Sequence, residues 1–278
     1  MKHTLLFAIL SLAVAVSCAE KATDVQHEKV AERCGWNEYM PKLRGDVDSV
    51  AIVITEPAYD ATYKYGYKFN SRGDVEEWGS FYSDGTPCDK RLYKYDSEGR
   101  NTEVAWFRSE GPFWQTLRHT YDEQGKMVES IESAEGSGLN RVLYKHDEQG
   151  RLIETLYCDN EGNVSGRIRY NYDHKGDKIE TLSYTSSNVL ESKECYAYDE
   201  KGNVESVNFY DEDGELIGRY LYSYDSRGNM VESIGNRYRT RYQYVYDEYD
   251  NVVESKEYDA KEETLRSIAE FKIYYRQK

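Results

Sequence analysis

The chain has 278 residues and a formal net charge of −15 at pH 7, with 51 Asp and Glu against 36 Lys and Arg. Binding to nucleic-acid phosphates depends on Lys and Arg, so this balance argues against a nucleic-acid partner. Hydrophobic residues make up a modest 39% of the chain, but 28 residues are tyrosine. Tyrosine favours strands and joins an apolar ring to a polar tip. We therefore expect an all-β protein and not a helix bundle.

The first 18 residues resemble a secretory signal peptide. Basic Lys2 precedes an apolar run, which is too short to cross a bilayer and ends in small residues. Residues 15–18, Ala-Val-Ser-Cys, resemble the lipobox of bacterial lipoproteins, in which Cys18 becomes the lipidated first residue. Ordinary cleavage after Ala19 is the alternative. Either route exports the protein, and residues 19–46 then read as a tether with a possible short helix.

A repeat of about 26 residues is the strongest signal, and the motif Tyr-Asp-x-x-Gly sets its register. Five copies keep the full motif, and three are degenerate. Successive glycine positions are separated by 26, 26, 25, 26, 26, 26 and 22 residues, so the eight copies cover residues 62–259. These positions are Gly73, Gly99, Gly125, Gly150, Gly176, Gly202, Gly228 and Asp250, where aspartate replaces the glycine.

Each copy is predicted to be a β-hairpin. Ahead of the turn, aromatic and polar residues alternate, as at Tyr220, Tyr222 and Tyr224, and a period of two indicates a strand. In the turn, Asp accepts hydrogen bonds from nearby backbone and glycine takes the left-handed conformation. We expect Asp to pair with the residue after glycine, as in Asp96 with Arg100. The same register sets the tyrosine three before Asp opposite a recurring glutamate, one of Glu77, Glu103, Glu129, Glu154, Glu180, Glu232 and Glu254.

Two strands per copy predict about sixteen antiparallel strands in an up-and-down meander. We expect one domain over residues 47–278, in which capping strands at 47–56 and 262–278 flank the repeats. A sheet with so many strands must twist and curl. The predicted architecture is therefore a long coiled or spiral sheet, with stability summed from neighbouring units.

The cadence Tyr-x-Tyr-Asp-x-x-Gly-Asn at residues 196–203 and 222–229 resembles the YD repeats of the Rhs and teneurin family. In that family such repeats form long antiparallel sheets that spiral, sometimes into hollow shells. This chain is too short to enclose a cargo domain, and toxin delivery is not implied. The closer likeness is to small exported bacterial YD-repeat lipoproteins, which implies no enzymatic activity.

The polar motifs favour structure over chemistry. The glutamates recur identically, whereas an active site needs one distinct pair of carboxylates. Residues 159–162 and 211–214 resemble fragments of a calcium loop, but no bidentate glutamate follows, so turn chemistry is the better account. His119 and His146 occupy tyrosine positions and His174 lies in a turn, which favours substitution over a metal site. We predict a non-enzymatic protein without metal or cofactor.

Four further cysteines, Cys34, Cys88, Cys158 and Cys195, lack the spacing of metal or redox pairs. Export would permit disulfides. Because the repeat already supplies cohesion, we expect mostly free, half-buried thiols.

One hairpin departs from the tyrosine pattern. Trp106, Phe107 and Trp114 surround a turn at residues 110–111, where a two-residue loop would set Phe107 opposite Trp114. Trp78, one repeat earlier, would lie within reach. Aromatic side chains of this kind bind sugars or protein partners. These four residues are the candidate ligand-binding cluster, although local packing is the better account of them.

The sequence thus predicts a lipid-anchored protein of the bacterial envelope that offers a binding or scaffolding surface to an envelope protein or a glycan. A carbohydrate-active hydrolase that uses two acidic residues is the second hypothesis, but we find no unique acid pair. A passive spacer is the third, and it predicts no exposed aromatic cluster.

Overall fold

The computed structural model describes residues 43–108, 113–134 and 140–276. At residues 113–114 it describes the backbone but not the side chains. The predicted signal peptide, Cys18, Cys34 and most of the tether lie outside the described residues. The described chain is almost entirely β-structure, with eighteen strands and a three-residue 3-10 helix, η1 (Pro57–Tyr59). The strands are β1 (Val47–Glu56), β2 (Ala61–Phe69), β3 (Val75–Phe81), β4 (Pro87–Tyr95), β5 (Asn101–Arg108), β6 (Phe113–Tyr121), β7 (Met127–Ala134), β8 (Asn140–His146), β9 (Leu152–Cys158), β10 (Val164–Tyr172), β11 (Lys178–Thr185), β12 (Leu190–Tyr198), β13 (Val204–Asp211), β14 (Leu216–Tyr224), β15 (Met230–Ile234), β16 (Arg239–Tyr246), β17 (Val252–Asp259) and β18 (Thr264–Tyr275).

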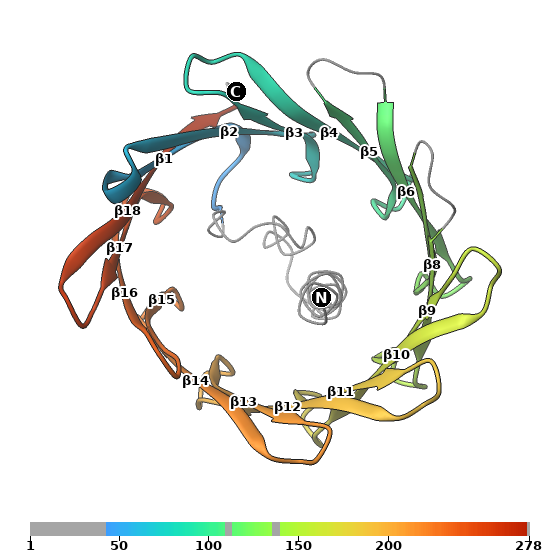
Figure 1. Cartoon of the computed structure of the whole chain (residues 1–278). Helices are drawn as coiled ribbons and strands as arrows, with labels where there is room; N and C mark the ends of the chain where they lie inside the picture. The colour runs from blue at the N-terminus through green and yellow to red at the C-terminus, as the bar shows by residue number, and fades with distance from the viewer. Residues whose placement is uncertain (1–42, 109–112, 135–139, 277–278) are drawn as a thin grey trace.

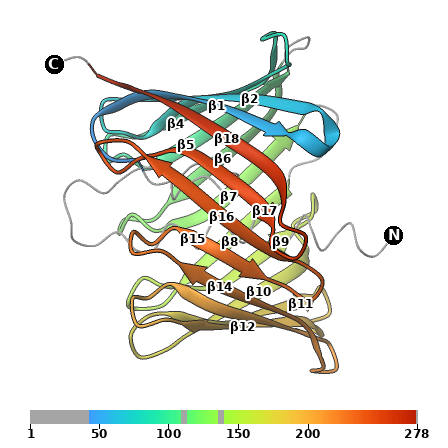
Figure 2. The same cartoon turned by 90° about the vertical axis from the view of Figure 1, so that its left-hand side faces the viewer.

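The antiparallel meander is confirmed, but the expected open, coiled sheet is wrong. Strands β2 to β17 are the sixteen strands of the repeats, and the two capping strands bring the sheet to eighteen. Strand β1 pairs with both β2 and β18, so the sheet closes into a barrel (Figure 1). The strands are inclined to the barrel axis, as closure requires (Figure 2). Closure pairs the backbone groups that two open edges would leave exposed.

The predicted turn chemistry is confirmed. Asp96 Oδ1 accepts a hydrogen bond from the backbone N–H of Glu98 at 2.9 Å, and the Asp96 N–H donates to the Arg100 carbonyl at 3.0 Å. Gly99 has a φ of 83°, the left-handed conformation that the turn requires. Asp250, which replaces glycine in the last copy, adopts the same conformation with a φ of 63°. The Asp96–Arg100 charge pair also forms, at 2.6 Å.

The predicted pairing of tyrosine with glutamate is wrong by one residue. Tyr93 lies opposite Val104, and Glu103 lies opposite Lys94. A bulge between Lys94 and Tyr95 adds one residue to the strand that leaves the turn, and this shifts the register. Neighbouring strand residues point to opposite faces. The glutamates therefore lie on the other face of the sheet from the tyrosines, and the same shift recurs at the other six glutamates.

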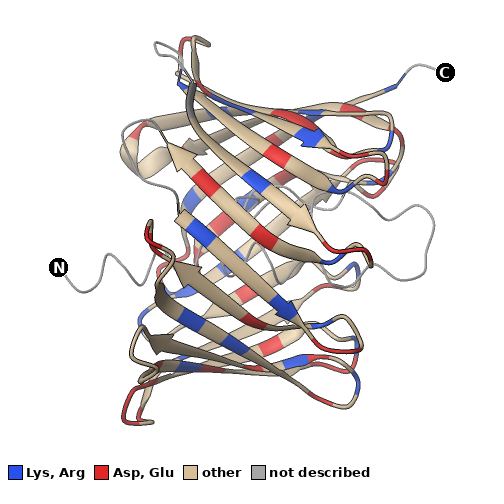
Figure 3. Ribbon diagram, turned by 90° about the vertical axis from the view of Figure 1, so that its right-hand side faces the viewer, with Lys and Arg blue, Asp and Glu red and all other residues tan. Residues whose placement is uncertain are grey.

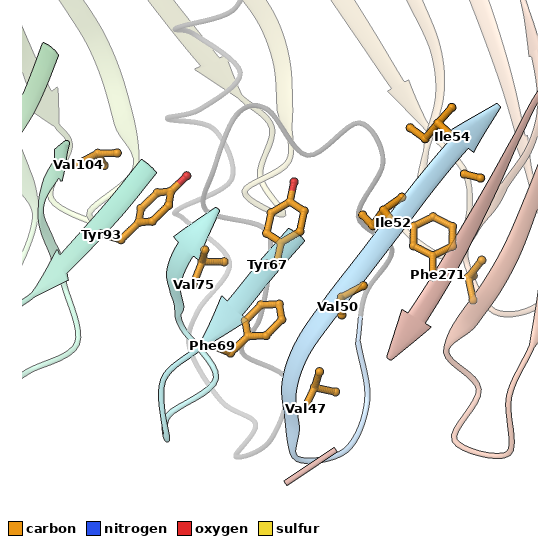
Figure 4. Packing of buried hydrophobic residues seen from close by; sticks show 12 residues of the cluster. Val47, Val50, Ile52, Ile54, Tyr67, Phe69, Val75, Tyr93, Val104 and Phe271 are labelled. Atoms are coloured by element: carbon orange, nitrogen blue, oxygen red, sulfur yellow. The ribbon is translucent and has the colours of Figure 1, made fainter. Parts of the chain in front are cut away.

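The largest apolar cluster holds the closure together. Val50 and Ile52 of β1 lie opposite Ile273 and Phe271 of β18, and Ile52 is 1% exposed. Figure 4 shows Val50, Ile52 and Phe271 together with Tyr67 of β2. The apolar strand β1 therefore joins β2 to β18 and closes the sheet.

Hydrogen bonds also stabilise the closure seam, which is the junction of β1 with β18 and β2. The fully buried Asn251 donates to the Arg44 carbonyl at 2.8 Å and to the Tyr275 hydroxyl at 2.7 Å, and its Oδ1 accepts from the Arg44 N–H. Arg276 follows β18 and donates to the Phe69 carbonyl at 2.6 Å, across β1. The bonds to Arg44 and to Phe69 join residues 207 positions apart in the chain.

Candidate ligand-binding surface

The barrel wall has two faces of different chemistry. Tyr93 and Val104 are buried on one face, whereas Lys94 pairs with Glu103 on the other and is 70% exposed. Side chains converge on the concave face of a curved sheet and spread apart on the convex face. The crowded aromatic face therefore lines the lumen, and the ionic face is the outer surface.

The lumen is wide. Eighteen strands spaced about 4.8 Å apart and tilted about 40° form a barrel roughly 36 Å across between opposite backbones. Wall side chains cannot meet across that distance, and closed sheets of this strand number leave a channel. The lumenal face is therefore a large aromatic surface that the wall itself does not fill.

Tyrosine hydroxyls tie each repeat to the one before, which sequence reasoning missed. The motif tyrosine donates to the carbonyl of the residue two after the preceding glycine, and this 20-residue separation recurs in the sequence and could have revealed the bond. The pairs are Tyr95 with Val75 (2.7 Å), Tyr121 with Asn101 (2.6 Å), Tyr172 with Leu152 (2.7 Å), Tyr198 with Lys178 (2.6 Å) and Tyr224 with Val204 (2.9 Å). Burial, aided by two nearby aspartates, raises the pKa of Tyr198 to about 12, so its ring is neutral at pH 7.

Two of the predicted ligand-binding residues lie together in this lumen. Trp78 of β3 and Trp106 of β5 both pair with Arg91 of β4, whose guanidinium lies 4.4 Å from the Trp78 ring centroid and 5.7 Å from that of Trp106. Tyr65 stacks on Trp78 with a centroid separation of 6.1 Å. The row continues to Gln115, opposite Trp106 on β6. Aromatic rings therefore alternate with hydrogen-bonding groups along this part of the wall.

Phe107 does not join that cluster, and its predicted partner is wrong. It lies opposite Lys90, next to Trp106 in the strand, and so belongs to the outer face. It pairs with Phe113 because a bulge shifts the register between Trp106 and Phe107. The backbone of Trp114 lies in this bulge, and its side chain lies outside the described residues.

Six of the recurring glutamates form ion pairs on the outer face, and Glu180 accepts a hydrogen bond from the Asn171 amide at 2.6 Å. Glu103 accepts from Lys94 at 2.6 Å and from Arg118 at 2.9 Å, and these hydrogen bonds lower its pKa. Glu154 is 8% exposed and accepts from Lys145 at 2.6 Å and Arg169 at 3.1 Å. Burial acts to raise the pKa of Glu154, but the cationic donors outweigh it and the net pKa is lowered. Acidic and basic residues are interspersed along the strands (Figure 3).

The three histidines within the described residues occupy three different positions of the repeat. His119 takes the buried tyrosine position and its Nδ1 lies 2.7 Å from Ser130 Oγ, which also accepts from the Tyr144 hydroxyl at 3.1 Å. His146 replaces the motif tyrosine, and His174 is exposed in a turn. Among the described residues, no three His, Cys, Asp or Glu side chains are placed to hold a metal ion.

The two calcium-like segments are ordinary turns. Asp211 Oδ1 accepts from the N–H of Asp213 at 3.1 Å and of Glu215 at 2.9 Å, while Gly214 has a φ of 81°. The segment at 159–162 is built in the same way.

The described cysteines, Cys88, Cys158 and Cys195, are free thiols, and Cys158 is buried. This agrees with the expectation for these three. Across the described ranges, no helix is long and apolar enough to span a membrane.

No known protein family and no curated protein matches the chain. Among solved structures, a porin-like protein from Bacteroides uniformis is 9% identical with a TM-score of 0.46, and the match covers 82% of this chain and 98% of that one. A chain of the Photorhabdus luminescens Tc holotoxin pore is 10% identical with a TM-score of 0.24, over 80% of this chain and 18% of that one. A LolA superfamily protein from Nitrosomonas europaea is 10% identical with a TM-score of 0.19, over 83% and 85%. These likenesses are too weak to place the chain in a family.

Proposed function

We propose that this protein is a non-enzymatic, exported, YD-repeat barrel of the bacterial envelope that binds a glycan on its lumenal face. One observation carries the proposal. The lumenal wall presents Trp78, Arg91 and Trp106 in one row, on a surface too wide for the barrel's own side chains to cover. A glycan is favoured because aromatic edges contact the apolar faces of sugars while polar groups bind the hydroxyls.

The polar groups along the row support this ligand class. Gln115, opposite Trp106, donates to the Glu132 carboxylate of the next strand. An amide and a carboxylate beside an indole provide both donors and acceptors for sugar hydroxyls. The repeated glutamates, in contrast, lie on the outer face in ion pairs or, at Glu180, in a hydrogen bond with Asn171, which supports a structural role for them and argues against a hydrolase built on that row.

Two adjacent residues of β5 give a matched test. Trp106 faces the lumen and Phe107 faces outward, so Trp106→Ala and Phe107→Ala remove aromatic rings from opposite sides of the same wall. We expect tryptophan fluorescence of the wild type to change saturably with peptidoglycan fragments or another envelope glycan. Affinity should fall at least tenfold in Trp106→Ala and remain within twofold in Phe107→Ala. Circular dichroism of each variant checks the fold.

Two results would contradict the lumenal site. One is equal loss of affinity in both variants, and the other is the absence of a saturable response to any envelope glycan by the folded wild type. The second result would leave a protein partner or a passive spacer as the remaining accounts.

Lipid attachment at Cys18 is a separate proposal, supported by the lipobox. Acyl chains on one cysteine would hold the barrel at a membrane surface. Cys18→Ala should move the protein from the membrane fraction to the soluble fraction and abolish incorporation of labelled palmitate. Unchanged fractionation would show that the anchor lies elsewhere.

A further inference from the structure

A groove of about 410 Å³ opens between two neighbouring turns of the repeat, at residues 122–126 and 147–151. We call it the His146 groove. The residues that line it include Asp122, Lys126, Val128, Tyr144, His146 and Asp147. It lies at the end of the barrel where the Tyr-Asp turns are, away from the tryptophan row.

The repeat explains why the groove lies here. In five copies the motif tyrosine covers the space beside the preceding turn and donates its hydroxyl to that copy's backbone, as Tyr121 does to Asn101 and Tyr172 does to Leu152. His146 replaces this tyrosine. An imidazole is shorter than a phenol and has no hydroxyl at its far end. The groove therefore opens where a phenol ring stands elsewhere in the barrel.

One acceptor that holds a phenol at two other turns, the carboxylate of the turn aspartate, is present at the groove. Tyr246 and Tyr275 each donate to the aspartate of the preceding turn, Asp225 and Asp247, at 2.7 Å. The equivalent aspartate here is Asp122, which lines the groove.

The cation that covers the ring is retained as well. The guanidinium of Arg100 lies 5.0 Å from the ring centroid of Tyr121, and Arg151 lies 5.0 Å from that of Tyr172. Lys126 occupies the position of these arginines, directly after the turn glycine. Its side chain lies over the next turn, where a Cβ added to Gly150 would meet the ammonium. A cation above a ring face is attractive.

We propose that the His146 groove binds the phenolic ring of another molecule. The ring would take the place of the missing tyrosine. The hydroxyl of the ligand donates to the Asp122 carboxylate, the Lys126 ammonium covers the ring, and Val128 supplies an apolar wall. This site is independent of the lumenal glycan site, because the two share no residues. Burial and the nearby Lys126 lower the pKa of His146, with Asp122 and Asp147 opposing, so the imidazole is largely uncharged beside the ligand at pH 7.

The experiment titrates the full-length protein with p-cresol, which is the tyrosine side chain without its backbone, by calorimetry. Toluene tests the hydroxyl, and N-acetyltyrosinamide distinguishes a tyrosyl peptide from a small phenol. We expect saturable binding of p-cresol and at least tenfold weaker binding of toluene. Binding of N-acetyltyrosinamide at least as tight as that of p-cresol would identify the source as a protein partner, and weaker binding would identify a small phenol.

Two histidine variants form a matched pair. His146→Tyr restores the ring of the other repeats, so it should abolish p-cresol binding and raise the melting temperature. His174→Tyr adds the same ring at an exposed turn and should leave the p-cresol affinity within twofold. Lys126→Met removes the ring-covering cation and should weaken binding at least threefold, which keeps the proposal testable if His146→Tyr does not fold.

Three results would overturn the proposal. They are the absence of p-cresol binding to the wild type, equal affinities for p-cresol and toluene, and unchanged p-cresol binding in a folded His146→Tyr protein. None of them bears on the lumenal site, whose test uses other ligands and other residues.

Discussion

Protonation of His119 should weaken the barrel as the pH falls below neutrality. The imidazole stands where other repeats bury a tyrosine, beside Ser130 and Tyr144, and burial lowers its pKa from 6.5 to about 4. The folded protein therefore holds His119 neutral, while the unfolded chain takes up a proton near pH 6.5. A lowered folded pKa means that the stabilisation is complete above about pH 6.5 and is lost as the pH falls toward about 4.

The magnitude follows from linkage. Each pH unit between the two pKa values costs about 1.4 kcal/mol, so moving from pH 7 to pH 5 should cost about 2 kcal/mol through this residue alone. His119 is half-buried and not fully buried, so this value is an upper bound. Most carboxylates titrate below pH 5, which keeps their contribution small in this range.

The assay is urea unfolding at pH 7 and pH 5, followed by circular dichroism. His119→Tyr restores the residue of the other repeats, and its unfolding free energy should fall by about 2 kcal/mol less than that of the wild type between these pH values. His174→Gln, at an exposed turn, should behave as the wild type. An unaltered pH dependence in a folded His119→Tyr protein would refute the reasoning, because His119 would then not be held neutral by burial.

Three further substitutions test the architecture. Asn251→Ala removes a fully buried amide from the closure seam and should cost about 3 kcal/mol in urea unfolding, and a loss below 1 kcal/mol would mean that the seam does not depend on it. Tyr172→Phe deletes one inter-repeat hydrogen bond and should lower stability by about 1 kcal/mol, or the melting temperature by about 3 °C. Glu154→Gln should cost about 2 kcal/mol, more than the equivalent Glu254→Gln, because the Glu154 side chain is 11% exposed and that of Glu254 is 30% exposed. Equal losses would show that burial does not set the strength of these pairs.

Local chemistry made much of this fold predictable. The alternation around Tyr222, the Asp96 turn and the left-handed Gly99 depend on residues a few positions apart, and the structure contains them as predicted. The repeat then multiplies one hairpin into a meander. The segments that contain Ile52 and Phe271 were also predicted to be strands, and both residues are buried. Their pairing with each other was not predicted.

Part of the candidate site was predictable for the same reason. Trp78 and Trp106 are one repeat apart, and Arg91 lies on the strand between them, so equivalent positions reach the same face. Phe107 was wrongly predicted to join the tryptophan cluster. It is adjacent to Trp106 in the strand, and adjacent strand residues point to opposite faces of the sheet.

The sequence alone determined the hairpin unit, its turns and its number, because those depend on contacts within about 26 residues. Only the tertiary structure decided the bulged register, the closure of β1 on β18 and the chemistry of each face. Closure depends on the twist summed over every strand, and no single repeat carries that information. The His146 groove has the same origin, because a missing ring becomes a cavity only when the neighbouring turn stands beside it.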